Sequence, residues 1–382
     1  MKNIDIHYMI NDGLNEMAAN AVEVVVDKNT GIAYAVYLSS ETSIGESSEL
    51  VKLAKFNIMQ PTNVQWVTVF NKDADFSGHV LSECNILELD DSYVRVFAID
   101  RVTSTYYYKD VKKKSLAVSM MNEVKFKSSE NSEAVSLNMQ NVKDYVVSQN
   151  SEPMKSLNMI TEIIKVDDCF YSILCGHVSE CSLLVKSADG AIWTVQSLIR
   201  HKVNFEAMLA YHDSKFWVMC RNGSEKETTE TQQNLLYSED GINWTQSNLS
   251  LTVSDTRPWL FNYQGELFLA YSSPMPDNYS TVRPWRCNIH IGKIISSNGC
   301  ESFEEIIYKE SKFGIVYYSL LDWYGKMIML YSSGELHPTE GLMRGWSQGK
   351  DCLNYTILHT QEPKLSFNTS STVKTTDEKL LI

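Results

Sequence analysis

Short apolar runs alternate with turn residues along most of the chain. The segment Tyr263–Ser273 recurs 60 residues later as Trp323–Ser333, and fainter copies occur at three earlier positions: His212–Asn222, Leu89–Ile99 and Lys28–Leu38. In each copy a turn of Asn, Asp, Gly or Ser precedes six or seven strand-forming residues, and another strand-like run precedes the turn. This pattern predicts an antiparallel β-hairpin in every copy.

A second hairpin is indicated by two related phrases, Leu183–Trp193 and Leu235–Trp244. Both contain Ser-x-Asp-Gly-x-x-Trp, and Asp-Gly is the residue pair that suits tight hairpin turns. The Asp carboxylate can accept backbone N–H bonds within its own turn, and the Trp can lie flat against a neighbouring strand. Two hairpins in about 40–60 residues make a four-stranded antiparallel unit, which is typical of a β-propeller blade.

The predicted fold is therefore an all-β propeller with six blades, or five if the second unit is irregular. It forms a single domain over residues 1–360, with few helices, a polar insertion near residues 128–156, and a polar C-terminal tail at residues 361–382. The six predicted blades are Ala18–Phe70, Cys84–Lys127, Asn158–Leu198, Phe205–Leu249, Arg257–Tyr308 and Gly314–His359.

Composition and charge exclude several classes of function. The chain has 382 residues, is 43% apolar and carries a net charge of −13. Its one basic run, Lys112–Lys114, is interpreted as a solvated turn, so nucleic acid is not an expected partner. The eight cysteines form no C-x-x-C pair and no histidine lies at zinc-finger spacing, so neither a metal nor any other cofactor is predicted.

The expected location follows from the thiols and from the N-terminus. Cysteines within apolar runs, such as Cys220, suggest buried free thiols and a reducing compartment. The N-terminal residues contain no apolar stretch long enough for a signal sequence, and no apolar run could span a membrane. A cytoplasmic protein, or part of a particle assembled in the cytoplasm, fits best; secretion and the oligomeric state stay open.

The two Asp-Gly phrases resemble the Asp-box, or BNR repeat, of the sialidase (neuraminidase) superfamily. The family form usually has one residue between Asp and Gly, whereas here the two are adjacent, as in corners of five-bladed furanosidases. Further similarity follows in family order, in the segments Asn204–Ser224, Thr281–Ile294 and Val316–Tyr331. The resemblance covers about residues 180–335.

The resemblance implies a set of site residues. Tyr318 matches the catalytic tyrosine, and Glu206 matches the glutamate that would take its proton. Arg221, with Arg283 or Arg286, matches the arginines that hold a substrate carboxylate. Sialidases also use an arginine near the N-terminus, but the first arginine of this chain is Arg95.

Two roles have weaker matches in the sequence. Arg257 is the candidate for the missing arginine of the carboxylate clamp. Asp75, in an early loop, is the candidate acid that would protonate the leaving group, and His79 is a second polar group beside it.

The leading hypothesis is a sialidase-like exo-glycosidase that hydrolyses a terminal sugar, acidic or neutral, with a Tyr/Glu nucleophile pair. The alternative is a non-catalytic glycan-binding or structural propeller, such as part of a virion or surface assembly. A five-bladed furanosidase that uses carboxylates alone is a third interpretation. Aromatic residues near strand ends, including Trp323 and Tyr324, support carbohydrate as the partner in each case.

Overall fold

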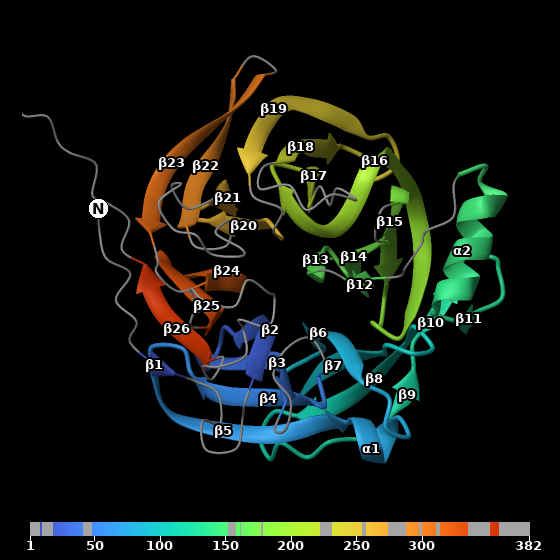
Figure 1. Cartoon of the computed structure of the whole chain (residues 1–382), viewed down its shortest axis with the longest axis vertical. Helices are drawn as coiled ribbons and strands as arrows, with labels where there is room; N and C mark the ends of the chain where they lie inside the picture. The colour runs from blue at the N-terminus through green and yellow to red at the C-terminus, as the bar shows by residue number, and fades with distance from the viewer. Residues whose placement is uncertain are drawn as a thin grey trace, which may run out of the picture.

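Six four-stranded antiparallel blades surround a central axis in the computed structural model (Figure 1). The all-β, six-bladed prediction is confirmed, and the five-bladed alternative is wrong. The structure describes residues 8–9, 18–40, 48–151, 158–160, 162–176, 179–221, 231–253, 257–273, 288–297, 300–310, 314–334 and 352–358.

The first two blades run outward from the axis in sequence order. Blade 1 consists of β2 (Ala18–Asp27), β3 (Ile32–Ser40), β4 (Leu50–Asn57) and β5 (Gln60–Asn71). Blade 2 consists of β6 (Leu81–Glu88), β7 (Tyr93–Asp100), β8 (Thr105–Lys112) and β9 (Asn122–Glu123). The short helix α1 (Lys72–Asp75) lies in the connection between them.

Blades 3 and 4 share one long strand. Blade 3 contains β12 (Asn158–Ile160), β13 (Ile164–Val166), β14 (Cys169–Cys175), β15 (Ser179–Ser187) and the first part of β16 (Ile192–His212). The second part of β16 pairs with β17 (Lys215–Arg221), followed by β18 (Thr231–Ser238) and β19 (Thr245–Val253). β16 is therefore the outer strand of one blade and the inner strand of the next.

The last two blades complete the ring. Blade 5 consists of β20 (Trp259–Tyr263), β21 (Glu266–Ser273), β22 (Asn288–Ser297) and β23 (Cys300–Glu310). Blade 6 consists of β24 (Gly314–Trp323), β25 (Lys326–Gly334), β26 (Cys352–Leu358) and the N-terminal strand β1 (Tyr8–Met9). Because β1 pairs with β26, both ends of the fold meet in one sheet and tie the ring shut.

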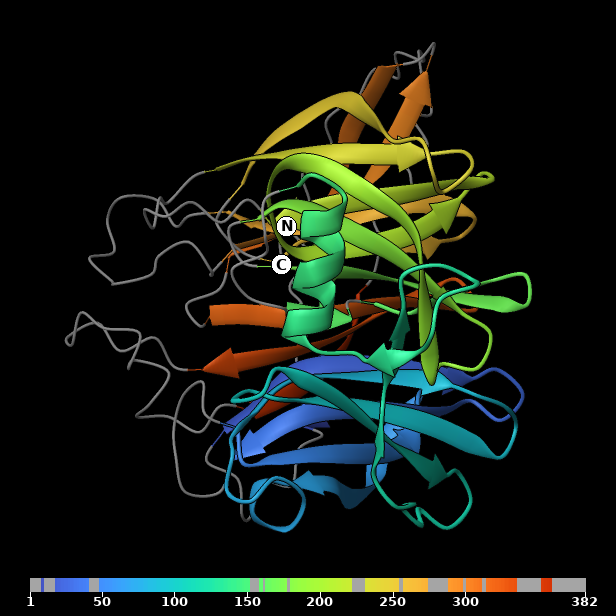
Figure 2. The same cartoon turned by 90° about the vertical axis from the view of Figure 1, so that its right-hand side faces the viewer.

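The predicted insertion at residues 128–156 carries local structure of its own. Strands β10 (Lys125–Lys127) and β11 (Val135–Ser136) lead into α2 (Met139–Ser148), which lies on the outside of the blades (Figures 1 and 2). Val142 and Val146, four residues apart, form its buried face. No helix in the described part of the chain is long and apolar enough to cross a membrane.

Apolar side chains fill the spaces between neighbouring blades. One cluster joins blades 4, 5 and 6 around Trp217, Trp259 and Met329, and others join each remaining pair of neighbours. The flat faces of the sheets are therefore buried against the neighbouring blades, as in other propellers. Side chains at the axis and at the two ends of the ring are left to carry the chemistry.

Candidate functional site

The inner strands of four blades are distorted at the same level of the axis. Ala21, Glu83, Glu206 and Tyr317 each have a positive φ of 45–53°, and each lies within a register shift of its strand pair. A residue with a Cβ loses roughly 1–2 kcal/mol in this left-handed conformation. β-Bulges re-aim side chains and are frequent beside active sites, so this level of the axis is the candidate site.

Glu206 and Arg221 form the first ion pair of the site. The Nη1 atom of Arg221 donates to Oε2 of Glu206 at 2.8 Å, and the Glu206 side chain is only 3% exposed. Antiparallel pairing of β16 with β17 sets this contact, because Phe205 lies opposite Arg221. The structure thus brings together two of the predicted site residues, to which the sequence had assigned separate roles, Glu206 as a base and Arg221 as a carboxylate ligand.

Arg257 forms a second, deeper ion pair with Glu23. Its Nη2 atom donates to Oε1 of Glu23 at 2.9 Å, and both side chains are buried. The guanidinium carbon lies 5.1 Å from the ring centroid of Trp259 and 5.8 Å from that of Tyr317. Arg257 therefore joins blade 5 to blade 1 and touches the aromatic residue at the start of blade 6.

Glu83 lies close enough to both ion pairs to interact with their charges. Burial, followed by the charge of Glu206, raises the pKa of Glu83 to about 7. Burial also raises the pKa of Glu23 to about 7, although its partner Arg257 opposes the shift. Among the described residues Glu83 has no comparable direct partner, so it is the carboxyl we expect to hold a proton near neutral pH.

Two adjacent tyrosines of β24 lie in different environments. Tyr318, the predicted nucleophile, is buried in the core between blades 5 and 6, where its hydroxyl donates to the Arg257 carbonyl at 3.3 Å. Burial raises the pKa of Tyr318 well above its ordinary value. The neighbouring Tyr317 is the residue at the bulge whose ring lies against the Arg257 guanidinium.

The remaining predicted residues have other partners or lie outside the described residues. Asp75, at the end of α1, pairs with Lys109 at 2.7 Å, and His79 contacts Asp100 at 3.0 Å. Both lie in the connection between blades 1 and 2, and their partners lie on strands β8 and β7 of blade 2. Arg283 and Arg286 lie outside the described residues.

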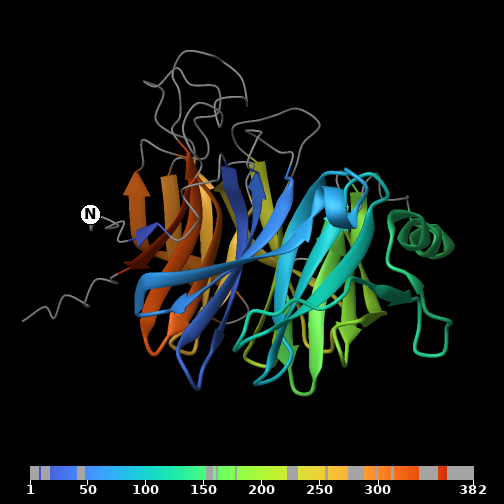
Figure 3. The same ribbon diagram turned by 90° about the horizontal axis from the view of Figure 1, so that it is seen from below.

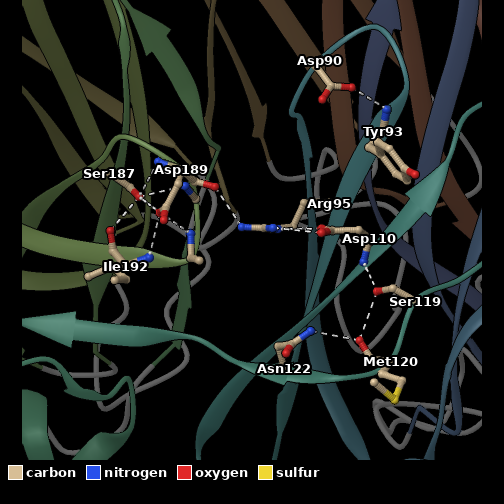
Figure 4. A network of polar contacts seen from close by, with 12 residues as sticks. Asp90, Tyr93, Arg95, Asp110, Ser119, Met120, Asn122, Ser187, Asp189 and Ile192 are labelled. Atoms are coloured by element: carbon tan, nitrogen blue, oxygen red, sulfur yellow. Dashed lines mark hydrogen bonds and ion pairs between the residues drawn. The ribbon is translucent and has the colours of Figure 1, made fainter.

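The Asp-Gly phrases form closed corners at the ends of blades 3 and 4. Asp189 Oδ1 accepts the backbone N–H groups of Ala191 and Ile192, and Ser187 bonds within the same turn (Figure 4). Although burial opposes it, these backbone bonds lower the pKa of Asp189. Arg95 donates to the Asp189 carbonyl at 2.8 Å, which ties blade 2 to this corner.

The corner tryptophans complete the same structural role. Trp193 is fully buried and donates to the Gly190 carbonyl at 3.0 Å, while Trp244 donates to Ser197 of the preceding blade. The interpretation of these phrases as blade corners therefore agrees with their contacts.

Glu23, Glu83 and Tyr317 have no counterpart among the residues predicted from the sequence. The sequence does contain a signal for the two glutamates. Each is a single charged residue near the start of an apolar inner strand, as in VEVVV at residues 22–26. Buried carboxylates in such positions are rare without a partner. Tyr317 could be separated from Tyr318 only by the bulge, which the sequence does not show.

Comparison with known proteins identifies the architecture. No protein-family model matches the sequence, and no curated protein is detectably similar to it. Trypanosoma rangeli sialidase in complex with the inhibitor DANA superposes with a TM-score of 0.54 at 11% identity, over 90% of this chain and 55% of that one. The chain has the propeller fold of the sialidases.

Two further sialidase structures have the same propeller fold. The Hadza microbial sialidase Hz136 gives a TM-score of 0.57 at 12% identity, over 90% of this chain and 66% of that one. The NanB sialidase from Streptococcus pneumoniae gives 0.53 at 10% identity, over 94% and 70%. The chain spans about half the length of the Trypanosoma enzyme, and these identities establish the fold alone.

Proposed function

We propose that the chain is a sialidase-like exo-glycosidase whose site is the cluster at the level of the inner-strand bulges. One observation carries the proposal: two arginines, three glutamates and a tyrosine from five blades meet there around buried ion pairs. The set is Glu23, Glu83, Glu206, Arg221, Arg257 and Tyr317. Buried charges are costly to fold, so such a gathering favours a chemical role.

The residue types fit a tyrosine-based hydrolysis. Glu206 would take the proton of a tyrosine hydroxyl, whose oxygen would then attack the anomeric carbon. As the glycosidic C–O bond breaks, Glu83 would give its proton to the leaving oxygen, a task that suits a pKa near the working pH. Water would release the sugar from the tyrosine in the second step.

Tyr317 is the favoured nucleophile of the two neighbouring tyrosines. It lies at the bulge beside Arg257, whereas the Tyr318 hydroxyl is held against a backbone carbonyl in the core. Asp75 remains the second candidate for the acid, with His79 beside it. Arg221, Arg257 and either Arg283 or Arg286 are the proposed ligands of an acidic group on the sugar.

Paired variants test this assignment. Chromogenic glycosides of neutral sugars and of sialic acid would be assayed with the wild-type chain, Tyr317→Phe, Tyr318→Phe, and Tyr93→Phe as a surface control. Loss of the nucleophile should lower kcat at least about a hundredfold, the scale of groups that act directly in the reaction. The assignment predicts this loss for Tyr317→Phe only; a loss confined to Tyr318→Phe would return the role to Tyr318.

A non-catalytic glycan-binding propeller is the second candidate. It is favoured by one observation: Arg221 and Arg257 each form an ion pair with a glutamate. A substrate carboxylate would therefore have to compete with that glutamate for each guanidinium. Glycan binding without turnover in the wild-type chain, with binding unchanged in Tyr317→Phe, would support this candidate and contradict hydrolysis.

Two finer assignments accompany the proposal. The corners at Asp189 and Asp240 are proposed as Asp-boxes, because each carboxylate accepts two backbone N–H bonds inside a Ser-x-Asp-Gly turn. A reducing compartment is proposed because the described cysteines, such as the buried Cys84, form no disulfide with one another. Burial raises the pKa of the Cys175 thiol to about 12, which keeps it protonated and unreactive.

A further inference from the structure

A cavity of about 550 Å³ lies at the end of the axis where the inner strands turn back. Short hairpin turns gather at one end of the blades (Figure 3). Residues from blades 1, 3, 4, 5 and 6 line the cavity, most of them at or next to these turns. Ligand-binding cavities have volumes of roughly 300–1,000 Å³, with mainly apolar walls and a few polar groups. This cavity has that size and that character.

Glu162 is one of the polar groups on the wall of the cavity, which is also lined by Lys28, Lys165, Asn262 and Asp322. It lies just before β13 on the inner side of blade 3, and its Oε2 atom is buried without a hydrogen-bond partner among the described residues. Burial, followed by the charge of Glu23, raises the pKa of Glu162 well above its ordinary value. The carboxyl is then uncharged, and it offers one O–H donor and one acceptor.

Aromatic rings stand at the mouth of the same cavity. Trp323 and Tyr324 end β24 and begin the turn to β25, with their ring centroids 4.8 Å apart. Tyr324 is 81% exposed and has a positive φ of 48°. The same turn position in blades 4 and 5 carries Asp213 and Gln264, both small or flexible polar residues. The Tyr324 hydroxyl donates to the Lys28 carbonyl at 3.4 Å, while the high exposure of the ring leaves it open to a ligand.

We propose that this cavity is a second ligand site, which binds a neutral sugar residue. Flat rings suit the apolar face of a sugar, and the protonated Glu162 and the Asn262 side chain suit its hydroxyl groups. A neutral ligand is proposed because the protonated Glu162 offers hydrogen bonds without a charge, and free sialic acid is the competing probe because the exposed Lys28 and Lys165 also line the cavity. The site differs from the proposed hydrolytic site, since Trp323 and Tyr324 lie at the opposite end of β24 from Tyr317.

Binding measured by ligand-observed NMR and calorimetry tests the proposal. The probes are the methyl glycosides of glucose, galactose and N-acetylglucosamine, with free sialic acid as the anionic probe. Glu162→Leu removes the carboxyl, and Tyr324→Asn removes the ring while relieving the positive φ. Glu206→Gln, which alters only the other site, is the matched control.

We expect at least one neutral glycoside to bind the wild-type chain and Glu206→Gln equally. Affinity should fall about tenfold in Glu162→Leu, the equivalent of one lost hydrogen bond to a buried group. It should fall similarly in Tyr324→Asn, which remains folded because Asn tolerates the turn. Three outcomes would overturn the proposal: no neutral glycoside binds, only sialic acid binds, or binding is lost in Glu206→Gln but kept in Glu162→Leu. None depends on whether the chain hydrolyses glycosides.

Discussion

The partly buried carboxyl of Glu83 makes folding stability depend on pH. Burial, followed by Glu206, raises its pKa from 4.5 to about 7 in the folded chain. Below both values the carboxyl is protonated whether the chain is folded or unfolded, so it has no effect. As the pH rises between them, only the unfolded chain releases the proton, and the folded state becomes progressively less stable. The loss is complete above about pH 7.

The size of the loss follows from the two pKa values. The difference between 4.5 and about 7 corresponds, at about 1.4 kcal/mol per pKa unit, to about 3 kcal/mol of unfolding free energy. Glu23, with its pKa also raised to about 7 by burial, acts in the same direction. Its salt bridge with Arg257 favours the charged form, so we expect the larger part of the effect from Glu83.

Urea unfolding of the wild-type chain and of Glu83→Gln, at about pH 5 and pH 8, measures this effect. The wild-type chain should lose stability between the two pH values, and Glu83→Gln should lose about 3 kcal/mol less. Glu304→Gln, an exposed glutamate on β23, is the control and should follow the wild-type chain. If Glu83→Gln also followed the wild-type chain at both pH values, Glu83 would be ionised in the fold and unsuited to the role of acid.

Two further predictions concern packing and the deep ion pair. Gly190→Ala would place a Cβ 2.5 Å from Cδ2 of Leu87 at a φ of +73°. At Gly265 the φ is +77°, but no atom lies near the added Cβ. Thermal unfolding should therefore show a larger decrease in Tm for Gly190→Ala than for Gly265→Ala. Equal decreases in Tm would contradict this, because they would mean that the Leu87 side chain moves aside without a loss of stability. Arg257→Met should cost about 3–5 kcal/mol in urea unfolding by leaving Glu23 buried without its partner, and the double variant with Glu23→Leu should recover most of it. A double variant as unstable as Arg257→Met would show that Arg257 stabilises the fold through other contacts.

The blade pattern was predictable because it depends on local rules. Strand-forming runs separated by Asp, Asn and Gly turns specify hairpins without reference to distant residues, and the predicted fifth blade, Arg257–Tyr308, lies within two residues of the observed one. The closing strand β1 was not predictable in this way. Its pairing with β26 joins segments more than 340 residues apart, and two residues carry little pattern.

The ion pairs of the candidate site were predictable only in part. Glu206 and Arg221 lie on adjacent strands of one hairpin, so family order was enough to select both residues for the site, but it did not predict their ion pair. Glu23 and Arg257 meet across 234 positions of sequence, a contact that only ring closure creates. The choice between Tyr317 and Tyr318 depends on one bulge, which shifts side chains from one face of the strand to the other.

The cost of the axial cluster is itself an argument for function. Apolar residues of similar size can replace a buried ion pair without loss of stability and often with a gain, so folding alone gives no reason to keep Glu23 with Arg257 or Glu206 with Arg221. Both pairs lie at bulged strands whose positive φ values add further strain. A chain needing only a stable ring would be expected to carry Val or Leu at these positions, as it does elsewhere between its blades. Charge and strain placed together at one level of the axis therefore favour the proposed binding or catalytic centre over a purely structural propeller.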